Sequence, residues 1–181
     1  PTHVFVQAGV GRLAGGVVGY YAPKYKVNPP VMVVCEASAA DCLYRSAMKE
    51  SGDLVNVGGD LQTIMAGLAC GEANTIGWDI IRNHVSVFAS CPDWMSAKAT
   101  RIYANPLGND PHIVSGESGS VPLGLCFTAL HDEDAKDLKE ALKLDENSNV
   151  LVISTEGDTD PVRYREIVWD GLYGTNESLS K

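Results

Sequence analysis

The sequence predicts an α/β fold, with an open, mostly parallel and twisted sheet that carries helices on both faces. Short β-branched runs alternate along the chain with stretches of helical length, which is the pattern of repeated strand and helix units. The run Val31 to Cys35 is apolar at every position, as in a strand buried on both faces of a parallel sheet. We find no internal repeat and no linker, so residues 1–181 are expected to form a single domain.

The first half of the chain is expected to hold three strands and four helices. A short apolar run ends in a glycine-rich turn, and small residues follow over a helical length. Pro29 and Pro30 then break the chain, and Ser38 is an N-cap candidate for a helix that stops at Gly52. We predict strands at His3 to Gln7, Val31 to Cys35 and Val85 to Ala89, and helices at Leu13 to Tyr21, Ser38 to Ser51, Leu61 to Cys70 and Ile76 to His84.

The second half is expected to continue the alternation and to add a last strand. Pro92 lies at the first turn of one predicted helix, where proline is well tolerated. Asp158 and Asp160 come shortly before Pro161, so we interpret them as turn and cap residues. We predict helices at Pro92 to Ala104, Ser118 to Leu130, Glu133 to Leu144 and Pro161 to Trp169, and a strand at Asn149 to Ile153.

The composition is that of a soluble globular protein and argues against two classes of partner. Hydrophobic residues make up 45% of the chain and charged residues 20%, which excludes intrinsic disorder. The formal net charge of −9 disfavours contact with nucleic acid and with anionic membranes. The apolar runs are far shorter than the roughly 20 residues of a membrane span. We therefore expect no nucleic-acid partner and no membrane.

The first residues indicate whether the chain is part of a longer protein, and the cysteines indicate its redox environment. Pro1 and Thr2 precede a strand-like run directly, with neither an initiator Met nor a signal pattern, so we expect a piece of a longer protein. The five cysteines are odd in number and lack C-x-x-C spacing, which argues against a disulfide framework and against a zinc site. We expect a reducing cytoplasm, with each cysteine acting as a small buried hydrophobic residue.

The segment from Gln7 to Leu13 places glycines where a strand hands over to a helix. Backbone N–H groups can converge on a phosphate there, which is the local device that an acidic chain needs to bind an anion. Two other interpretations stay open from the residues alone. Gly9-x-Gly11-x-x-Ala14 fits the dinucleotide fingerprint of a nicotinamide-dependent, NAD(P)-binding oxidoreductase, with Glu36 as the ribose ligand. The third is a non-catalytic binding module in which the turn is structural.

Eight segments in a fixed order carry a more specific signal, namely Gln7 to Gly11, Cys35 to Tyr44, Gly59 to Asp60, Thr63 to Gly71, Thr75 to Trp78, Ser90 to Asp93, Gly116 to Gly119 and Ser154 to Asp160. Together they resemble the C-terminal half of the diaminopropionate ammonia-lyase family. That family belongs to the fold type II group of pyridoxal-phosphate enzymes, with tryptophan synthase β, threonine deaminase and serine racemase. The resemblance covers essentially the whole chain and implies an open twisted sheet flanked by helices.

The resemblance implies where the cofactor phosphate is held. In that group of enzymes the glycine-rich turn holds it, mainly through backbone N–H groups. The contact then falls on Gly9, Val10, Gly11, Arg12 and Leu13.

The resemblance also implies residues for the cofactor ring. Ser154 lies in a segment similar to the one in tryptophan synthase β whose serine faces the pyridine nitrogen, and Thr155 is the alternative. A hydroxyl cannot keep that nitrogen protonated as a carboxylate does, so the ring would be a weaker electron sink. Glu117 resembles a glutamate that begins a helix beside the cofactor in threonine deaminases. It would support polar groups of the cofactor or substrate, or complement a helix dipole.

Two features of the related enzymes have no counterpart in the sequence. Glu36 aligns with a divalent-cation ligand of serine racemase, but Cys42 stands where an aspartate is expected, so we predict no metal site. The Schiff-base lysine and the acidic residues that manage substrate protons are expected upstream of this chain. Lys24 and Lys26 lie near prolines in what we predict to be a surface connection, and they do not replace that lysine.

The implied function is that of part of a lyase that converts 2,3-diaminopropionate to pyruvate and ammonia by α,β-elimination, with pyridoxal 5′-phosphate as cofactor. This chain would hold the phosphate and ring-nitrogen ends of the cofactor and would be inactive alone. The implied partners are a small amino-acid substrate, the N-terminal half of the same enzyme and a second copy in a homodimer.

Overall fold

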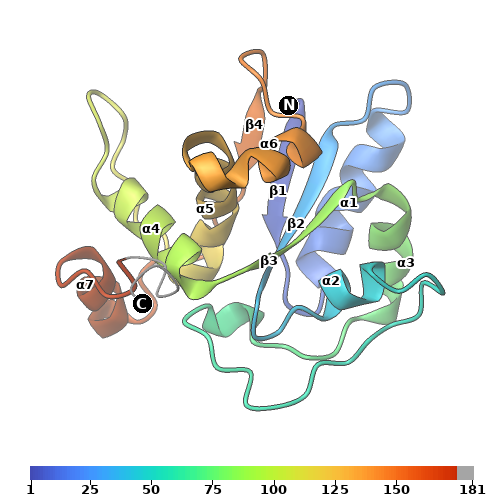
Figure 1. Cartoon of the computed structure of the whole chain (residues 1–181), viewed down its shortest axis with the longest axis horizontal. Coiled ribbons are helices and arrows are strands. Elements are labelled where there is room, and N and C mark those ends of the chain that lie inside the picture. The colour runs from blue at the N-terminus through green and yellow to red at the C-terminus, as the bar shows by residue number, and fades with distance from the viewer. Residues whose placement is uncertain (175–181) are drawn as a thin grey trace.

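A computed structural model describes residues 1–174 of the chain. Four strands among these residues form one sheet in the order β3-β2-β1-β4, and all neighbouring strands run parallel (Figure 1). His3 pairs with Val31 on one side and with Val150 on the other, which fixes the register of the central strand. The predicted α/β class is confirmed. The strands are β1 (His3–Gln7), β2 (Val31–Ala37), β3 (Val87–Cys91) and β4 (Val150–Val152).

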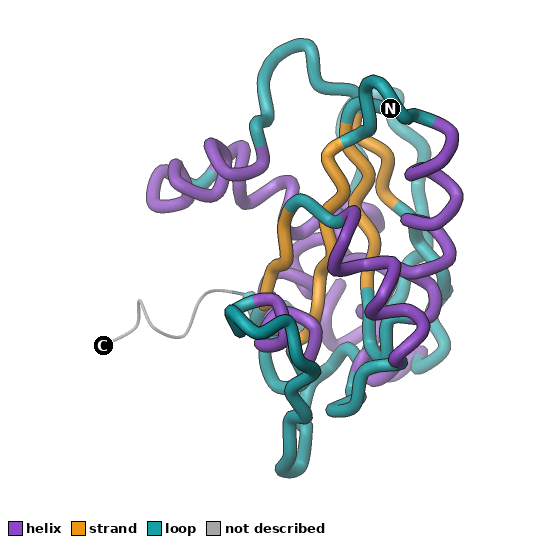
Figure 2. Tube along the Cα trace, turned by 90° about the vertical axis from the view of Figure 1, so that its right-hand side faces the viewer, coloured by secondary structure: helices purple, strands orange, loops and turns teal. Residues whose placement is uncertain are grey.

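Helices cover both faces of the sheet, as predicted (Figures 1 and 2). The first and third helices pack on one face, the fifth packs on the other, and the fourth lies against the fifth. No helix among residues 1–174 has both the length and the apolar character that a membrane span requires. The elements are α1 (Arg12–Lys24), α2 (Cys42–Ala47), α3 (Thr75–His84), α4 (Asp93–Ala104), α5 (Glu117–His131), α6 (Lys136–Leu142) and α7 (Pro161–Val168), with 3-10 turns η1 (Ala66–Leu68) and η2 (Glu133–Ala135).

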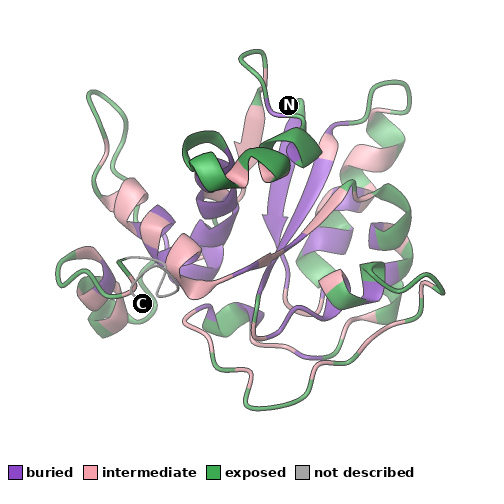
Figure 3. Cartoon of the chain, viewed as in Figure 1, coloured by how far each residue is buried: buried purple, intermediate pink, exposed green. Residues whose placement is uncertain are grey.

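The alternation of side chains along the strands divides the core into two layers. Val6 of β1 packs toward α1 and α3, against Ala14 and Trp78. Phe5 of the same strand packs toward α5, against Leu125. Figure 3 shows the buried residues gathered on β1 and β2 and on parts of the helices, whereas β3 and β4 are mostly intermediate. Every residue of β1 is buried. A strand enclosed in this way holds its carboxyl end in a fixed place, which positions whatever follows it.

The helix predicted from Leu61 to Cys70 is wrong. The structure has only the single turn η1 within that segment. Side chains take over the backbone groups that a helix would pair: Asp93 accepts the N–H of Ile64 at 3.2 Å, and Ser118 Oγ accepts the N–H of Gly67 at 3.1 Å. Tertiary hydrogen bonds therefore override the helical pattern and hold this loop against α4 and α5.

Several other boundaries differ from the predictions. The helix expected from Ser38 begins only at Cys42, because residues 38–41 continue the strand end and form a turn in which the N–H of Ala40 bonds to the carbonyl of Ala37. The third strand starts two residues later than expected, because Val85 still caps α3. The helix expected from Glu133 to Leu144 is divided into η2 and α6. The second helix also ends at Ala47, four residues before the expected Ser51, and α1 runs to Lys24, three residues beyond the expected Tyr21. The remaining elements lie within one or two residues of their expected bounds.

Candidate functional site

The strand order creates a crevice at the carboxyl end of β1. Helix α1 leads from β1 to β2 on one side, whereas β4 lies on the opposite side of β1. In open parallel sheets, ligands bind where the strand order reverses in this way, outside the carboxyl ends of the strands. The residues after β1 are the glycine-rich turn, and the residues after β4 are Ser154, Thr155 and Glu156. The two segments that the sequence singled out are therefore brought together.

The glycine turn leaves no room for side chains on the backbone. Gly11 caps α1 with a φ of 88°, in the left-handed region that favours glycine, and a Cβ there would lie 3.1 Å from Ile81 Cδ1. A Cβ on Gly9 would lie 3.3 Å from the carbonyl oxygen of Gly67 in the η1 loop. The turn thus runs between the start of α1 and the η1 loop, and its conformation requires these two glycines.

The turn presents a set of backbone donors that nothing else uses. Among residues 1–174, no hydrogen bond engages the N–H groups of residues 9–13. The first N–H groups of a helix have no partner within it, and they carry the positive end of the helix dipole. The first turn of α1 also contains no acidic side chain. These donors suit an anion such as a phosphate.

A cavity of about 250 Å³ opens in front of these donors. Its walls include all five residues that the sequence assigned to the phosphate contact, and Arg12 is an exposed side chain at its edge. Gln7 and Ala8, at the end of β1, continue the same wall. The opposite walls come from the η1 loop, from the start of α5 and from the loop after β4, and they contain Gly67, Leu68, Cys70, Ser118, Thr155 and Glu156.

The two hydroxyl candidates after β4 face different neighbours. Thr155 lines the cavity and accepts a hydrogen bond from Gln7 Nε2 at 2.6 Å. Ser154 Oγ lies 2.7 Å from Ser115 Oγ, at the residue before the N-cap of α5. It also fills the space next to Gly119, where a Cβ would lie 3.0 Å from it. The structure therefore places Thr155 in the wall of the glycine-turn cavity and Ser154 beside it, toward α5.

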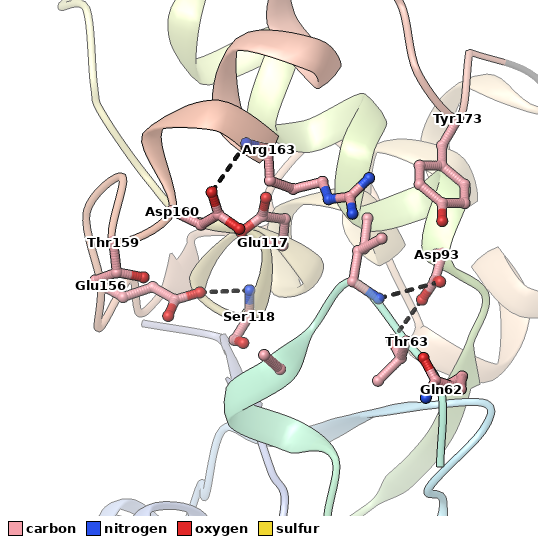
Figure 4. A pocket seen from close by; sticks show the side chains of 12 residues that line it. Gln62, Thr63, Asp93, Glu117, Ser118, Glu156, Thr159, Asp160, Arg163 and Tyr173 are labelled. Carbon is pink, nitrogen blue, oxygen red and sulfur yellow. Dashed lines mark hydrogen bonds between the residues drawn. The ribbon is translucent and has the colours of Figure 1, made fainter. Parts of the chain in front are cut away.

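Glu117 lines a second, more polar cavity of about 300 Å³ (Figure 4). Ser118 and Glu156 border both cavities, so the two are neighbours across one wall. Glu117 is 7% exposed, and its Oε1 has no hydrogen-bond partner among the residues that the structure describes. Burial raises the pKa of Glu117, and the nearby carboxylates of Glu156 and Asp160 raise it further.

The second cavity is acidic, and Glu156 is the residue in its wall that sequence reasoning missed. The walls carry Asp93, Glu117, Glu156 and Asp160 against the single cation Arg163. Glu156 Oε1 accepts the N–H groups of Ser118 at 2.5 Å and of Gly119 at 3.2 Å, so it caps the start of α5 from a distant segment. No local pattern in the sequence indicates this contact. Asp160, in contrast, caps α7 as predicted, by accepting the N–H of Arg163.

Glu36 is not a ribose ligand, which corrects the dinucleotide interpretation. Its side chain is fully buried and does not line the glycine-turn cavity. Both of its carboxyl oxygens are already used, by the N–H of Leu43 at 2.9 Å and of Tyr44 at 2.6 Å, at the start of α2. Burial raises the pKa of Glu36 to about 8. A carboxyl group held in this way stabilises a helix start and cannot reach a ribose hydroxyl.

The cysteines are free thiols and are mostly enclosed, as predicted. Cys35, Cys42, Cys91 and Cys126 are buried, and Cys70 is partly exposed in the wall of the glycine-turn cavity. Cys42 Sγ lies 3.8 Å from Glu36 Oε1, and burial raises the pKa of the Cys42 thiol to about 12. Among residues 1–174, no group of three or more His, Cys, Asp or Glu side chains is arranged to hold a metal ion.

Comparison with known proteins adds to this geometry. Residues 1–156 match a family model described as pyridoxal-phosphate dependent enzyme. The chain is 53% identical to diaminopropionate ammonia-lyase of Escherichia coli (strain K12) over 173 residues, which cover 96% of this chain and 43% of that protein. The chain thus spans less than half the length of this relative.

Two solved structures of the Escherichia coli enzyme have the same fold over this region. One is the complex with an aminoacrylate–pyridoxal phosphate azomethine reaction intermediate, with a TM-score of 0.88 and 48% identity over 96% of this chain and 43% of that one. The other is the complex with D-serine, with a TM-score of 0.87 and 49% identity over 96% of this chain and 42% of that one.

Proposed function

Because the chain belongs to the pyridoxal-phosphate dependent enzyme family, we propose that its glycine-turn cavity holds the phosphate of pyridoxal phosphate. The N–H groups of Gly9, Val10, Gly11, Arg12 and Leu13 would bind the phosphate oxygens. The observation that carries this proposal is the set of backbone donors at the start of α1, which have no partner among the described residues. Arg12 would add a positive charge from the exposed edge of the cavity.

The residues present fit a phosphate-bearing cofactor. Gly9 lies so close to the η1 loop that a side chain there would crowd the cavity wall. A Cβ at this position would lie 3.3 Å from the carbonyl oxygen of Gly67. The first turn of α1 has no carboxylate. Glu156, the acidic residue in the cavity wall, already accepts two N–H groups of α5. Donors therefore face the cavity at the turn, and the nearest carboxylate is held by the opposite wall.

The loop after β4 and the start of α5 would meet the other end of the cofactor. Pyridoxal phosphate supplies a conjugated ring that stabilises negative charge at the α-carbon of an amino acid. Ser154 and Thr155 offer neutral hydroxyl groups beside the cavity, so neither holds a ring nitrogen protonated as a carboxylate does. Glu117 would face polar groups of the cofactor or substrate from the neighbouring cavity.

We further propose that the protein containing this chain is a diaminopropionate ammonia-lyase. It would convert 2,3-diaminopropionate and water to pyruvate and two molecules of ammonia by α,β-elimination. The 53% identity to the Escherichia coli enzyme and the shared fold support this reaction over others of the family. In this proposal the enzyme is a homodimer, and it is located in the cytoplasm.

Catalysis in this proposal uses residues outside the chain. Among residues 1–174, no lysine lines either cavity. Lys24 is one of the two lysines that we weighed in the sequence as substitutes. It donates a hydrogen bond to the hydroxyl of Tyr20 at the exposed surface of α1. The lysine that binds the cofactor covalently and the groups that move substrate protons would come from the rest of the enzyme. This chain would supply the phosphate, ring-nitrogen and α5 walls.

An assay of the protein that contains this chain tests the function. Purified with pyridoxal phosphate, it is expected to release pyruvate and ammonia in a ratio of one to two from 2,3-diaminopropionate. A protein that acts on serine or threonine but not on 2,3-diaminopropionate would refute the substrate proposal and leave the cofactor proposal standing. A protein that binds no pyridoxal phosphate would refute both.

A further inference from the structure

One buried side chain joins the glycine turn to the loop after β4. Gln7, the last residue of β1, is 2% exposed, and its Nε2 donates to Thr155 Oγ1 at 2.6 Å. The two residues are 148 positions apart in the sequence, and both line the glycine-turn cavity. The hydrogen bond therefore spans the crevice between β1 and β4 from one wall of the cavity to the other.

Gln7 is an unfavourable residue for the stability of β1. The other end of its amide, Oε1, is buried and has no partner among residues 1–174. A buried polar atom without a hydrogen bond costs free energy, and the three residues before Gln7, namely Val4, Phe5 and Val6, are buried apolar side chains. Such a departure from the local pattern is expected at functional sites. Packing of the strand does not account for this amide, whereas its position in the cavity wall gives it a role at the site.

We propose that Gln7 is a positioning residue of the cofactor site, which fixes the Thr155 hydroxyl, and with it the loop 154–156, at a set distance from the glycine turn. This inference rests on the proposed function, because the two walls concerned are those that would meet the phosphate and the ring of the cofactor. A ligand that touches the glycine turn alone does not depend on this spacing. A ligand that touches both walls does.

The hydrogen bond also sets the direction of the Thr155 hydroxyl. Because Thr155 Oγ1 accepts from Gln7 Nε2, its own proton is free to be donated to an acceptor in the cavity. Gln7 would thus hold one wall in place and also leave the Thr155 hydroxyl proton free to be donated to the cofactor or substrate.

Binding of two probes to the full chain tests the proposal. Inorganic phosphate reports on the glycine turn alone, and pyridoxal phosphate reports on both walls. Gln7→Met removes the amide at nearly constant volume, Thr155→Val removes the hydroxyl, and Thr155→Ser keeps it. Dissociation constants are measured by titration calorimetry, the absorption spectrum of bound pyridoxal phosphate is recorded, and urea midpoints show whether each variant is folded.

The proposal makes an asymmetric prediction. Gln7→Met and Thr155→Val should each weaken pyridoxal phosphate binding by about tenfold, and the double variant should lose no more than either single one, because both remove the same contact. Both should shift the absorption spectrum in the same way. Thr155→Ser should behave like the wild type, and inorganic phosphate affinity should stay within about twofold throughout.

Two results would overturn the proposal while leaving the function intact. One is unchanged pyridoxal phosphate affinity in a folded Gln7→Met variant. The other is an equal loss of both probes, which would mean that Gln7 only supports the turn. If the whole protein that contains this chain binds inorganic phosphate but not pyridoxal phosphate, the proposed function is refuted, and this inference falls with it.

Discussion

The carboxylate of Glu156 accepts the backbone N–H of Ser118 at 2.5 Å, which fastens the loop after β4 to the first turn of α5. The same oxygen accepts the N–H of Gly119 at 3.2 Å. Both Glu156 and Ser118 border the glycine-turn cavity and the acidic cavity beside it. This contact therefore forms part of the wall that separates the two cavities. It also provides an acceptor for two N–H groups at the start of α5, which have none within the helix.

Removal of this cap is expected to destabilise the fold. Glu156→Ala leaves the N–H groups of Ser118 and Gly119 without their acceptor, and loss of a helix cap typically costs about 1 kcal/mol. Glu156→Gln keeps an acceptor oxygen and should lose less. Urea denaturation measures both, with the exposed Glu146→Ala as control. Equal stability of Glu156→Ala and Glu146→Ala would contradict the capping role.

An aspartate in the glycine turn is expected to abolish the anion site. Gly9→Asp adds a carboxylate where a Cβ would lie 3.3 Å from the carbonyl oxygen of Gly67, so it introduces both crowding and repulsion. We expect affinity for pyridoxal phosphate and for inorganic phosphate to fall by more than about tenfold, or about 1.4 kcal/mol. Gly16→Asp is the matched control, because Gly16 is exposed on α1 with open space around its Cβ position.

The difference in affinity between Gly9→Asp and Gly16→Asp decides the outcome. A folded Gly9→Asp variant that binds both probes as tightly as Gly16→Asp does would place the phosphate somewhere else.

Aspartate substitutions after β4 are expected to show which hydroxyl faces the ring nitrogen. A carboxylate next to that nitrogen favours its protonated form and changes the absorption of the bound cofactor. The resemblance assigns this place to Ser154, so Ser154→Asp should change the spectrum while phosphate binding persists. Spectra are recorded across pH with pyridoxal phosphate at saturation. A spectrum that changes with Thr155→Asp and not with Ser154→Asp would move the assignment to Thr155, which lines the cavity.

Glu36 is expected to make the fold less stable as pH rises. Its folded pKa of about 8 lies above the ordinary carboxyl value of 4.5, so the native state keeps a proton that the unfolded state loses between these values. The free energy of unfolding should therefore fall from about pH 4.5 to about pH 8 on account of this group. Glu36→Gln should be less stable overall, because its amide matches only one of two N–H donors, and its stability should vary less with pH.

Urea midpoints at several pH values in this range test the prediction, with the exposed Glu146→Gln as control. A Glu36→Gln variant that keeps the full pH slope of the wild type would assign that slope to other groups.

Local patterns predicted most of the fold and the part of the site that depends on the backbone. The run Val4 to Val6 is apolar and is followed by a glycine turn, so both the strand and the donor set after it follow from the residues. The Asp160 cap of α7 is equally local, because its partner is three residues away. Patterns of this kind are set by neighbours in the chain, and a sequence displays them directly.

Contacts between distant segments could not be predicted in the same way. The segment around η1 is not helical because the N–H of Ile64 donates to Asp93, 29 residues further along the chain, and the N–H of Gly67 donates to Ser118, 51 residues further along. In the sequence, Glu36 has the position of a ribose ligand near the end of a strand, but its carboxyl group accepts the N–H of Leu43 at the start of α2. Gln7 belongs to the glycine-turn segment, but its partner Thr155 becomes visible only when β1 and β4 are side by side.

The central claim is that the N–H groups of residues 9–13 bind the phosphate of pyridoxal phosphate. Amide chemical shifts of the full chain, followed by NMR during titration with pyridoxal phosphate, test it most directly. We predict that the largest shifts occur at Gly9, Val10, Gly11, Arg12 and Leu13, with further shifts at Thr155, and that inorganic phosphate competes for the first group alone. Saturable binding that leaves these five amides unmoved, or no binding by the folded chain, would contradict the account.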